Sequence, residues 1–203
     1  MTTYWQGIGF GLAYIAPIGL QNLFMIKTAL AQTRPRALIV AGFVTFFDIS
    51  LALASFFGIG QLLVTFHWLK LLILLVGSLV ILVMGYGLLR EKPDTTLAPS
   101  RDFRYGAAFV TAFSVAWLNP QAILDGTLLL GAFRVSLQGA AADWFVIGVC
   151  TASILWFFGI ALTLTWLRER FKPSFLVGLN RICGVVILVY GLRLMVDFIK
   201  AVA

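Results

Sequence analysis

Ala16-Pro17-Ile18-Gly19-Leu20-Gln21-Asn22 and Asn119-Pro120-Gln121-Ala122-Ile123-Leu124-Asp125 are the two stretches that decide how this chain folds. Each lies inside a long apolar run, and each has a proline where a helix would otherwise continue. Proline removes a backbone donor and clashes with the preceding turn, so both helices are predicted to break. Each stretch also has a polar side chain five residues after its proline. A broken helix exposes backbone groups that can bind a solute, which is typical of membrane transporters.

Composition places the chain in a membrane. Of its 203 residues, 61% are hydrophobic and 11% are charged, whereas soluble domains carry roughly 25% charged residues. A bilayer core about 30 Å thick needs about 20 apolar residues in a helix. Apolar runs of this kind predict six transmembrane helices, at 5–27, 37–66, 68–89, 105–133, 142–167 and 182–199. The runs lack the two-residue alternation of outer-membrane barrels.

The net charge of +7 is an orientation signal. Six helices divide the loops between two sides, and one side holds eleven of the fifteen basic residues: Lys27, Arg34, Arg36, Arg90, Lys92, Arg101, Arg104, Arg168, Arg170, Lys172 and Arg181. Basic loops stay in the cytoplasm. The loops after the first, third and fifth helices are therefore predicted to be cytoplasmic, with both termini outside. The basic excess favours contact with anionic lipid and gives no reason to expect a nucleic-acid partner.

The chain divides into two similar halves. The one clearly polar stretch, 91–104, is predicted to be a cytoplasmic linker between a first three-helix unit, 1–90, and a second, 105–203. Short matches recur at offsets of 101 to 104 residues: Pro17 with Pro120, Phe56-Phe57-Gly58-Ile59 with Phe157-Phe158-Gly159-Ile160, and Tyr86-Gly87-Leu88 with Tyr190-Gly191-Leu192. Three helices per half make the halves enter the membrane in opposite directions. The predicted fold is an all-α integral membrane protein with a 3+3 inverted repeat, a device of secondary transporters.

Polar residues inside the apolar runs are the candidates for function. Gln21 and Asn22 are two amides at mid-membrane depth, which is costly unless they find partners. Asp48 and Asp125 are lone acids, and intramembrane acids mark solute pathways or proton relays. The simpler alternatives are a plain kink at Pro17, which transmembrane helices tolerate, and a structural partner for Asp48.

The candidate substrate-binding residues lie at the two breaks and in the second helix. They are Pro17, Gly19, Gln21, Asn22, Asp48, Asn119, Pro120 and Asp125. The N-termini of half-helices offer free N–H groups and a positive dipole end to a carboxylate. Asp48 and Asp125 are also the candidates for proton coupling, because burial favours the neutral form of a carboxylic acid. No cofactor and no metal site is predicted, since the chain has a single His and scattered Met residues.

These residues resemble the lysine exporter (LysE) family, and its arginine-exporter branch in particular. The resemblance lies in Pro17 to Phe24, Asp48, Trp117 to Asp125 and Ser153 to Gly159, within a six-helix pattern that covers essentially the whole chain. Leu20 stands where the family often has a second proline. The resemblance implies a multi-pass protein of the bacterial inner membrane that exports amino acids, basic ones such as lysine or arginine in this branch. It also implies that proton exchange or the membrane potential drives transport.

Several alternatives remain at this stage. The nearest is an exporter of neutral amino acids or of another small solute. More distant ones are an intramembrane protease that uses Asp48 and Asp125 as a pair, and a scaffold that transports nothing. Direction of transport follows only from the resemblance. A homo-oligomer is possible, because Gly7 and Gly11 form a small-residue face that suits packing within the protomer or between protomers.

Overall fold

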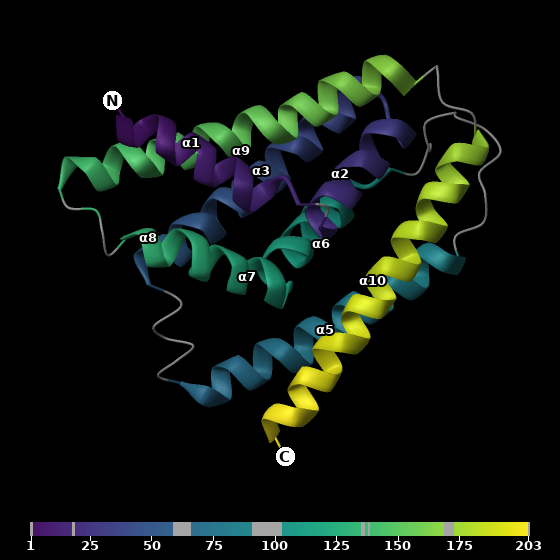
Figure 1. Ribbon diagram of the computed structural model, residues 1–203. Coiled ribbons are helices and arrows are strands. Elements are labelled where there is room, and N and C mark those ends of the chain that lie inside the picture. Colours follow the sequence, from purple (N-terminus) through teal and green to yellow (C-terminus); the bar gives the residue numbers. More distant parts are fainter. Residues whose placement is uncertain are drawn as a thin grey trace.

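A computed structural model describes residues 2–17, 19–58, 66–90, 103–134, 137, 139–168 and 173–202, and within these ranges the chain is helical, with no strand (Figure 1). The elements are α1 (Thr2–Ile15), α2 (Leu20–Ala31), α3 (Arg34–Phe57), α5 (His67–Arg90), α6 (Tyr105–Trp117), α7 (Pro120–Gly126), the π-helical turn η1 (Thr127–Gly131), α8 (Ala132–Arg134), α9 (Ala140–Leu167) and α10 (Pro173–Val202). The predicted all-α class is confirmed for this part of the chain.

Both predicted breaks are present. The last backbone hydrogen bond of α1 runs from Ala16 N to Leu12 O, and α2 begins after Gly19, whose backbone is extended. The axes of α1 and α2 differ by 81°. Pro17 explains the break because it has no N–H to continue the α1 ladder.

The second break spans fewer residues than the first and bends the chain by a smaller angle. α6 ends at Trp117, Asn119 is the extended N-cap of α7, and Pro120 follows at the start of the new helix. Proline is favoured at this first helical position, and it disfavours the helical conformation for the residue before it. The two parts of this run meet at 54°.

The described helices account for part of the predicted membrane topology. α3 and α9 are long and apolar enough to cross a bilayer, and the spans number four if each bent pair counts as one. α5 and α10 correspond to the third and sixth predicted spans, which stay predictions. Most of the predicted linker 91–104, and the end of the second predicted span at 59–65, lie outside the described residues. Two boundary predictions were wrong: α3 ends at Phe57, whereas the second helix was expected to reach residue 66, and the last helix begins at Pro173, before the expected residue 182.

α1 and α9 lie side by side along one edge of the molecule (Figure 1). Their backbones approach closely because glycines face each other at the crossing. A Cβ added to Gly7 would meet the Phe145 carbonyl, and one added to Gly148 would meet the Tyr4 carbonyl. A Cβ on Gly11 would lie 2.8 Å from Ala152 Cβ. The small-residue face of the first helix is therefore used inside this chain.

Replacing Gly7 with alanine is expected to lower the melting temperature of the purified protein in detergent, because α1 and α9 must separate. Overpacking of this kind costs about 1–3 kcal/mol. Gly9→Ala is the matched control on the same helix, since nothing lies within 4 Å of a Cβ there. Equal melting temperatures for the two variants would contradict this account of the crossing.

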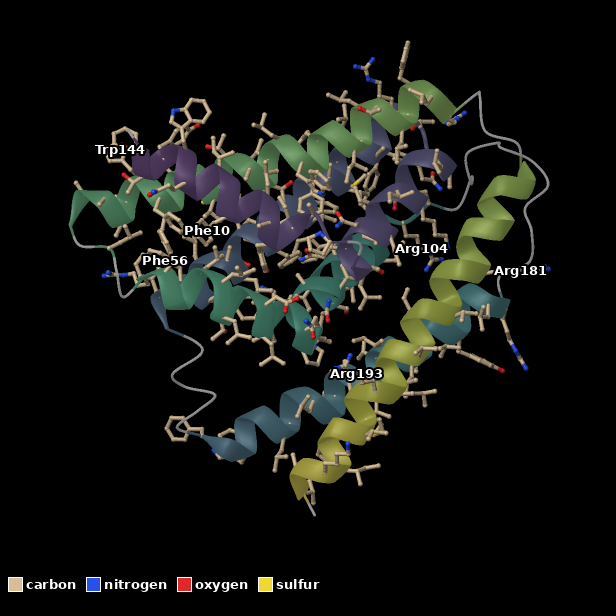
Figure 2. The ribbon with its side chains drawn as sticks, viewed as in Figure 1. Phe10, Phe56, Arg104, Trp144, Arg181 and Arg193 are labelled. Atoms are coloured by element: carbon tan, nitrogen blue, oxygen red, sulfur yellow. The ribbon has the colours of Figure 1, made fainter. Side chains whose placement is uncertain are left out.

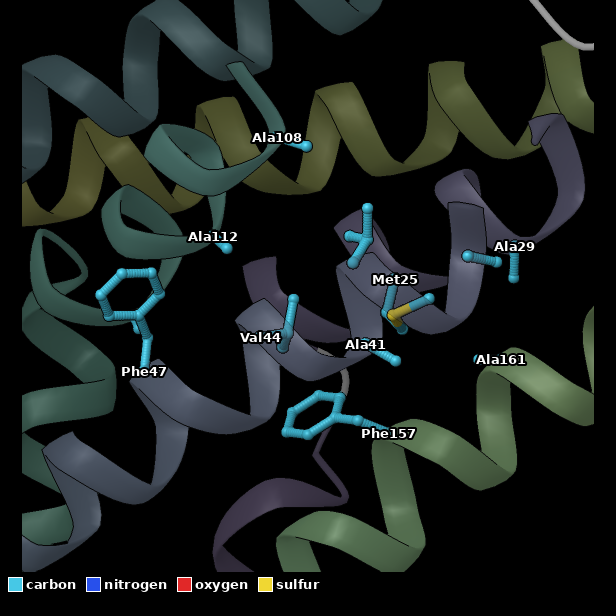
Figure 3. Close-up of a cluster of buried hydrophobic side chains, with 12 residues drawn as sticks. Met25, Ala29, Ala41, Val44, Phe47, Ala108, Ala112, Phe157 and Ala161 are labelled. Atoms are coloured by element: carbon cyan, nitrogen blue, oxygen red, sulfur yellow. The ribbon is translucent and has the colours of Figure 1, made fainter. Parts of the chain in front are cut away.

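The other helices form two further contacts. α2, α3, α6 and α9 meet around a core rich in alanine, with Met25, Phe47 and Phe157 filling the larger spaces (Figure 3). α5 and α10 pack against each other as a separate pair below this core in the view of Figure 1. Gly85, Gly184 and Gly191 lie in that contact, where an added Cβ would meet side chains of the facing helix at 2.8–3.0 Å.

Candidate functional site

Both helix breaks line one cavity of about 260 Å³. Its walls come from α1, α2, α7 and the α5–α10 pair. The lining residues are Tyr14, Ile15, Pro17, Gly19, Leu20, Gln21, Asn22, Leu23, Ile81, Asn119, Gln121, Ala122, Asp125 and Ile187. Pockets that take drug-sized ligands span roughly 300–1,000 Å³, so this volume suits a smaller solute.

The cavity brings together most of the residues that the sequence singled out. Pro17, Gly19, Gln21, Asn22, Asn119 and Asp125 line it, although the two breaks are about a hundred residues apart in sequence. Asp48 and Pro120 do not line it. Pro120 is buried against α5, where a Cβ on Gly77 would lie 2.6 Å from its ring, so Pro120 shapes the break.

Asn22 holds the first break in place. Its Nδ2 donates to the carbonyl oxygens of Ile15 at 2.7 Å and Pro17 at 2.8 Å. Its Oδ1 accepts a hydrogen bond from Trp156 Nε1 on α9 at 2.8 Å. Asn22 therefore satisfies carbonyls that the end of α1 leaves without helical partners, and its side chain is only 4% exposed.

The start of α2 presents backbone donors to the same cavity. The first intrahelical bond of α2 runs from Leu23 N to Gly19 O, and no side chain caps the helix at Gly19. The N–H groups of Leu20, Gln21 and Asn22 therefore have no partner within the helix. Such donors, together with the positive end of the helix dipole, form a site for an anion.

Asp125 supplies the one carboxylate among the lining residues. Its Oδ1 accepts a hydrogen bond from Gln121 Nε2 at 2.5 Å, one helical turn earlier on α7. Asn119 caps the same helix, since its Oδ1 accepts from Gln121 N at 3.2 Å. The second break therefore holds an acid at the wall of the same cavity that the start of α2 lines.

Asp48 lies deeper in the protein. Its residue surface is 0% exposed, and its Oδ2 accepts a hydrogen bond from Ser153 Oγ on α9 at 2.7 Å. The Gln21 amide approaches the same carboxyl group. Apart from this approach, neither Gln21 Nε2 nor Asp48 Oδ1 has a hydrogen-bond partner in the described ranges. Gln21 also lines the cavity, so it lies between the solute space and Asp48.

Four polar or aromatic residues of the site were not among those predicted: Tyr14, Gln121, Ser153 and Trp156. Tyr14 lines the cavity and lies within electrostatic range of both Asp48 and Asp125. The signals were weak in sequence. Tyr14 lies three residues before Pro17, as Trp117 lies three residues before Pro120, and Ser153 and Trp156 lay in a stretch that carried the family resemblance. These residues could have been found as polar or amphipathic side chains near the middle of a predicted span that packs against a helix break.

Comparisons with known proteins agree with this architecture. Residues 12–198 match the family model described as LysE type translocator. The arginine exporter protein ArgO of Klebsiella pneumoniae subsp. pneumoniae is 33% identical over 177 residues, which cover 85% of this chain and 83% of that protein. ArgO of Salmonella typhi is 33% identical over 175 residues, covering 84% and 82%. No solved structure gives a significant match.

The match covers both helix breaks and every residue that lines the cavity, and the relatives are matched over most of their length. The chain therefore belongs to the LysE family of translocators, a family of bacterial multi-pass membrane transporters that are not enzymes.

Proposed function

We propose that this protein exports amino acids from the cytoplasm, with basic amino acids, arginine or lysine, as its substrates. The observation that carries this proposal is the position of Asp125, the one carboxylate on the wall of a cavity between two broken helices. An acid in such an apolar setting is costly unless a cation pairs with it. The relatives named as arginine exporters support the same substrate class.

A free basic amino acid has three charged groups, and the cavity offers a partner for each. The uncapped N–H groups at the start of α2 suit the α-carboxylate. Carbonyl oxygens of the non-helical residues at the breaks suit the α-ammonium group. Asp125 suits the cationic side chain, with Gln121 fixing the carboxylate orientation.

The proposal includes alternating access between two halves, 1–90 and 105–203, joined by the linker 91–104 and related as an inverted repeat. The helix contacts support it, because they come in the pairs that a two-fold relation requires. α1 contacts α9 as α6 contacts α3, and α2 contacts α10 as α7 contacts α5. α3 contacts α9 and α5 contacts α10, each helix meeting its own counterpart. Rocking one half against the other would open the cavity to either side.

The proposed orientation in the inner membrane has both termini outside. Its support is a cluster of basic groups at one end of the bundle, with Arg104 and Arg181 near that end and Trp144 at the other (Figure 2). There Arg168 donates to Gln32 O at 3.0 Å and Arg36 lies 5.4 Å from the Phe103 ring centre. Loop ends that follow the first, third and fifth predicted helices therefore meet, which suits one cytoplasmic face.

Counterflow in proteoliposomes tests the substrate class. Vesicles loaded with unlabelled arginine or lysine are expected to take up the labelled form of either amino acid, and leucine or threonine on both sides should give no uptake above empty vesicles. Uptake of neutral amino acids alone would make this protein a neutral amino-acid exporter. The absence of uptake for all four would remove the proposal.

A further inference from the structure

A row of buried oxygens leads away from the cavity along α3. Asp48 and Ser55 lie seven residues apart, on the same face of the helix, about 10 Å from each other along its axis. Both residues are 0% exposed. Ser55 Oγ has no hydrogen-bond partner within the described part of the chain, whereas the Asp48 carboxyl group accepts from Ser153 Oγ and is approached by the Gln21 amide.

Tyr14 and Thr127 flank this row from the neighbouring elements. The Tyr14 ring and Ser55 Oγ both lie against Gly126, since a Cβ there would be 3.3 Å from Tyr14 Cε2 and 2.7 Å from Ser55 Oγ. Gly131, at the other end of the π-helical turn, lies between the Ser55 backbone and the Thr127 methyl group. Tyr14 OH and Thr127 Oγ1 are likewise buried and unpaired among the described residues.

Three unpaired hydroxyl groups in one buried region, those of Tyr14, Ser55 and Thr127, need an explanation. A buried hydroxyl without a partner costs about 1–3 kcal/mol, and Ala, Val or Phe would fill the same spaces without that cost. π-helical turns are rare and are often found at functional sites, and here such a turn directly follows Gly126, which lies against the Ser55 hydroxyl, and places Gly131 against the Ser55 backbone. Water-bridged hydroxyl groups of this kind can pass protons, because each can donate and accept.

We propose that Asp48, Tyr14, Ser55 and Thr127 form a proton route that runs beside the amino-acid cavity toward the end of the bundle where α3 ends. This inference rests on the proposed function, and it adds that a proton is coupled to the transport of the amino acid. A proton that enters at Thr127 is passed on as each hydroxyl, or a water between two of them, accepts one proton and releases its own. No hydroxyl changes its charge, and the Asp48 carboxylate becomes neutral at the end of the transfer.

The surroundings of the route favour a proton over an amino acid. Phe56 follows Ser55 directly and stacks on Phe145, with Phe10 and Phe133 packed beside them (Figure 2). These rings fill the space that a larger solute would need. Among the described residues, the other ionisable groups near the route are Cys150 of α9, within electrostatic range of Asp48, Asp125, within range of Tyr14, and Arg134, 5.6 Å from the Phe56 ring centre.

The test compares two transport modes in proteoliposomes. Exchange of labelled for unlabelled arginine needs no net proton movement, whereas uptake driven by a pH gradient does. Ser55→Ala and Thr127→Val are expected to keep arginine exchange and to reduce pH-driven uptake about a hundredfold, which is the low end for loss of a positioned proton-transfer group. Thr165→Val is the control, because its hydroxyl is paired with Ala161 O at 2.6 Å.

Three outcomes would overturn the route. The variants could keep full pH-driven uptake, they could lose exchange and pH-driven uptake together, or the wild type could exchange arginine without responding to a pH gradient. Absence of exchange in the wild type would remove the proposed function itself and the route with it. Melting temperatures separate a folding defect from these outcomes, since removing an unpaired buried hydroxyl should leave Ser55→Ala at least as stable as the wild type.

Discussion

Replacing Asp125 with asparagine is expected to abolish most transport of arginine and lysine. The substitution removes the negative charge that faces the cavity and keeps an oxygen that can accept the hydrogen bond from Gln121, so the second break should keep its geometry. Breaking a desolvated charge pair costs about 2–5 kcal/mol, which is roughly a 30-fold or larger loss in apparent affinity. The measurement is the concentration dependence of labelled arginine counterflow.

Asp143→Asn is the matched control for this prediction. Asp143 is exposed in the first turn of α9 and is not among the cavity residues, so the same change in charge there should leave counterflow unaltered. If Asp125→Asn counterflows arginine with wild-type affinity, the cationic side chain is recognised elsewhere and the proposed substrate pose is wrong. Asp48 would then be the next acid to replace.

The broken helices could be predicted from sequence because proline acts locally. Pro17 and Pro120 each interrupt a run that is otherwise apolar and helical, and the break follows from the missing donor and the steric clash without knowledge of any neighbour. The long apolar runs that became α3 and α9 were predictable for the same reason. Hydropathy and length are read from the segment itself.

The roles of the polar residues could not be predicted in the same way. Asp48 and Asp125 are both lone acids in apolar runs, and sequence gave no basis for deciding which one faces a solute. The answer depends on partners at a distance: Ser153, 105 residues from Asp48, takes up one of its oxygens, whereas Gln121 holds Asp125 at the cavity wall. For Asn22, which was predicted to bind substrate, the two carbonyl partners and Trp156 could not be predicted from sequence either.

Asn22→Ala is expected to have the largest effect on stability of any single change at the site. The substitution leaves the Ile15 and Pro17 carbonyls and the Trp156 indole N–H without their partner, in a buried region where each unpaired group costs about 1–3 kcal/mol. The loss is expected to lower the melting temperature in detergent strongly and to abolish arginine counterflow, since the start of α2 is positioned by these bonds.

Asn119→Ala provides the comparison at the other break. Its side-chain oxygen accepts one hydrogen bond, from Gln121 N, and loss of an N-cap costs about 0.5–2 kcal/mol. The melting temperature should therefore fall less than for Asn22→Ala. If Asn22→Ala instead melts like the wild type while counterflow is lost, Asn22 acts as a direct ligand of the amino acid. In that case the packing of Tyr14, Ile15 and Leu20 holds the break after α1. The Ile15 and Pro17 carbonyls must then find other partners when the transporter changes conformation.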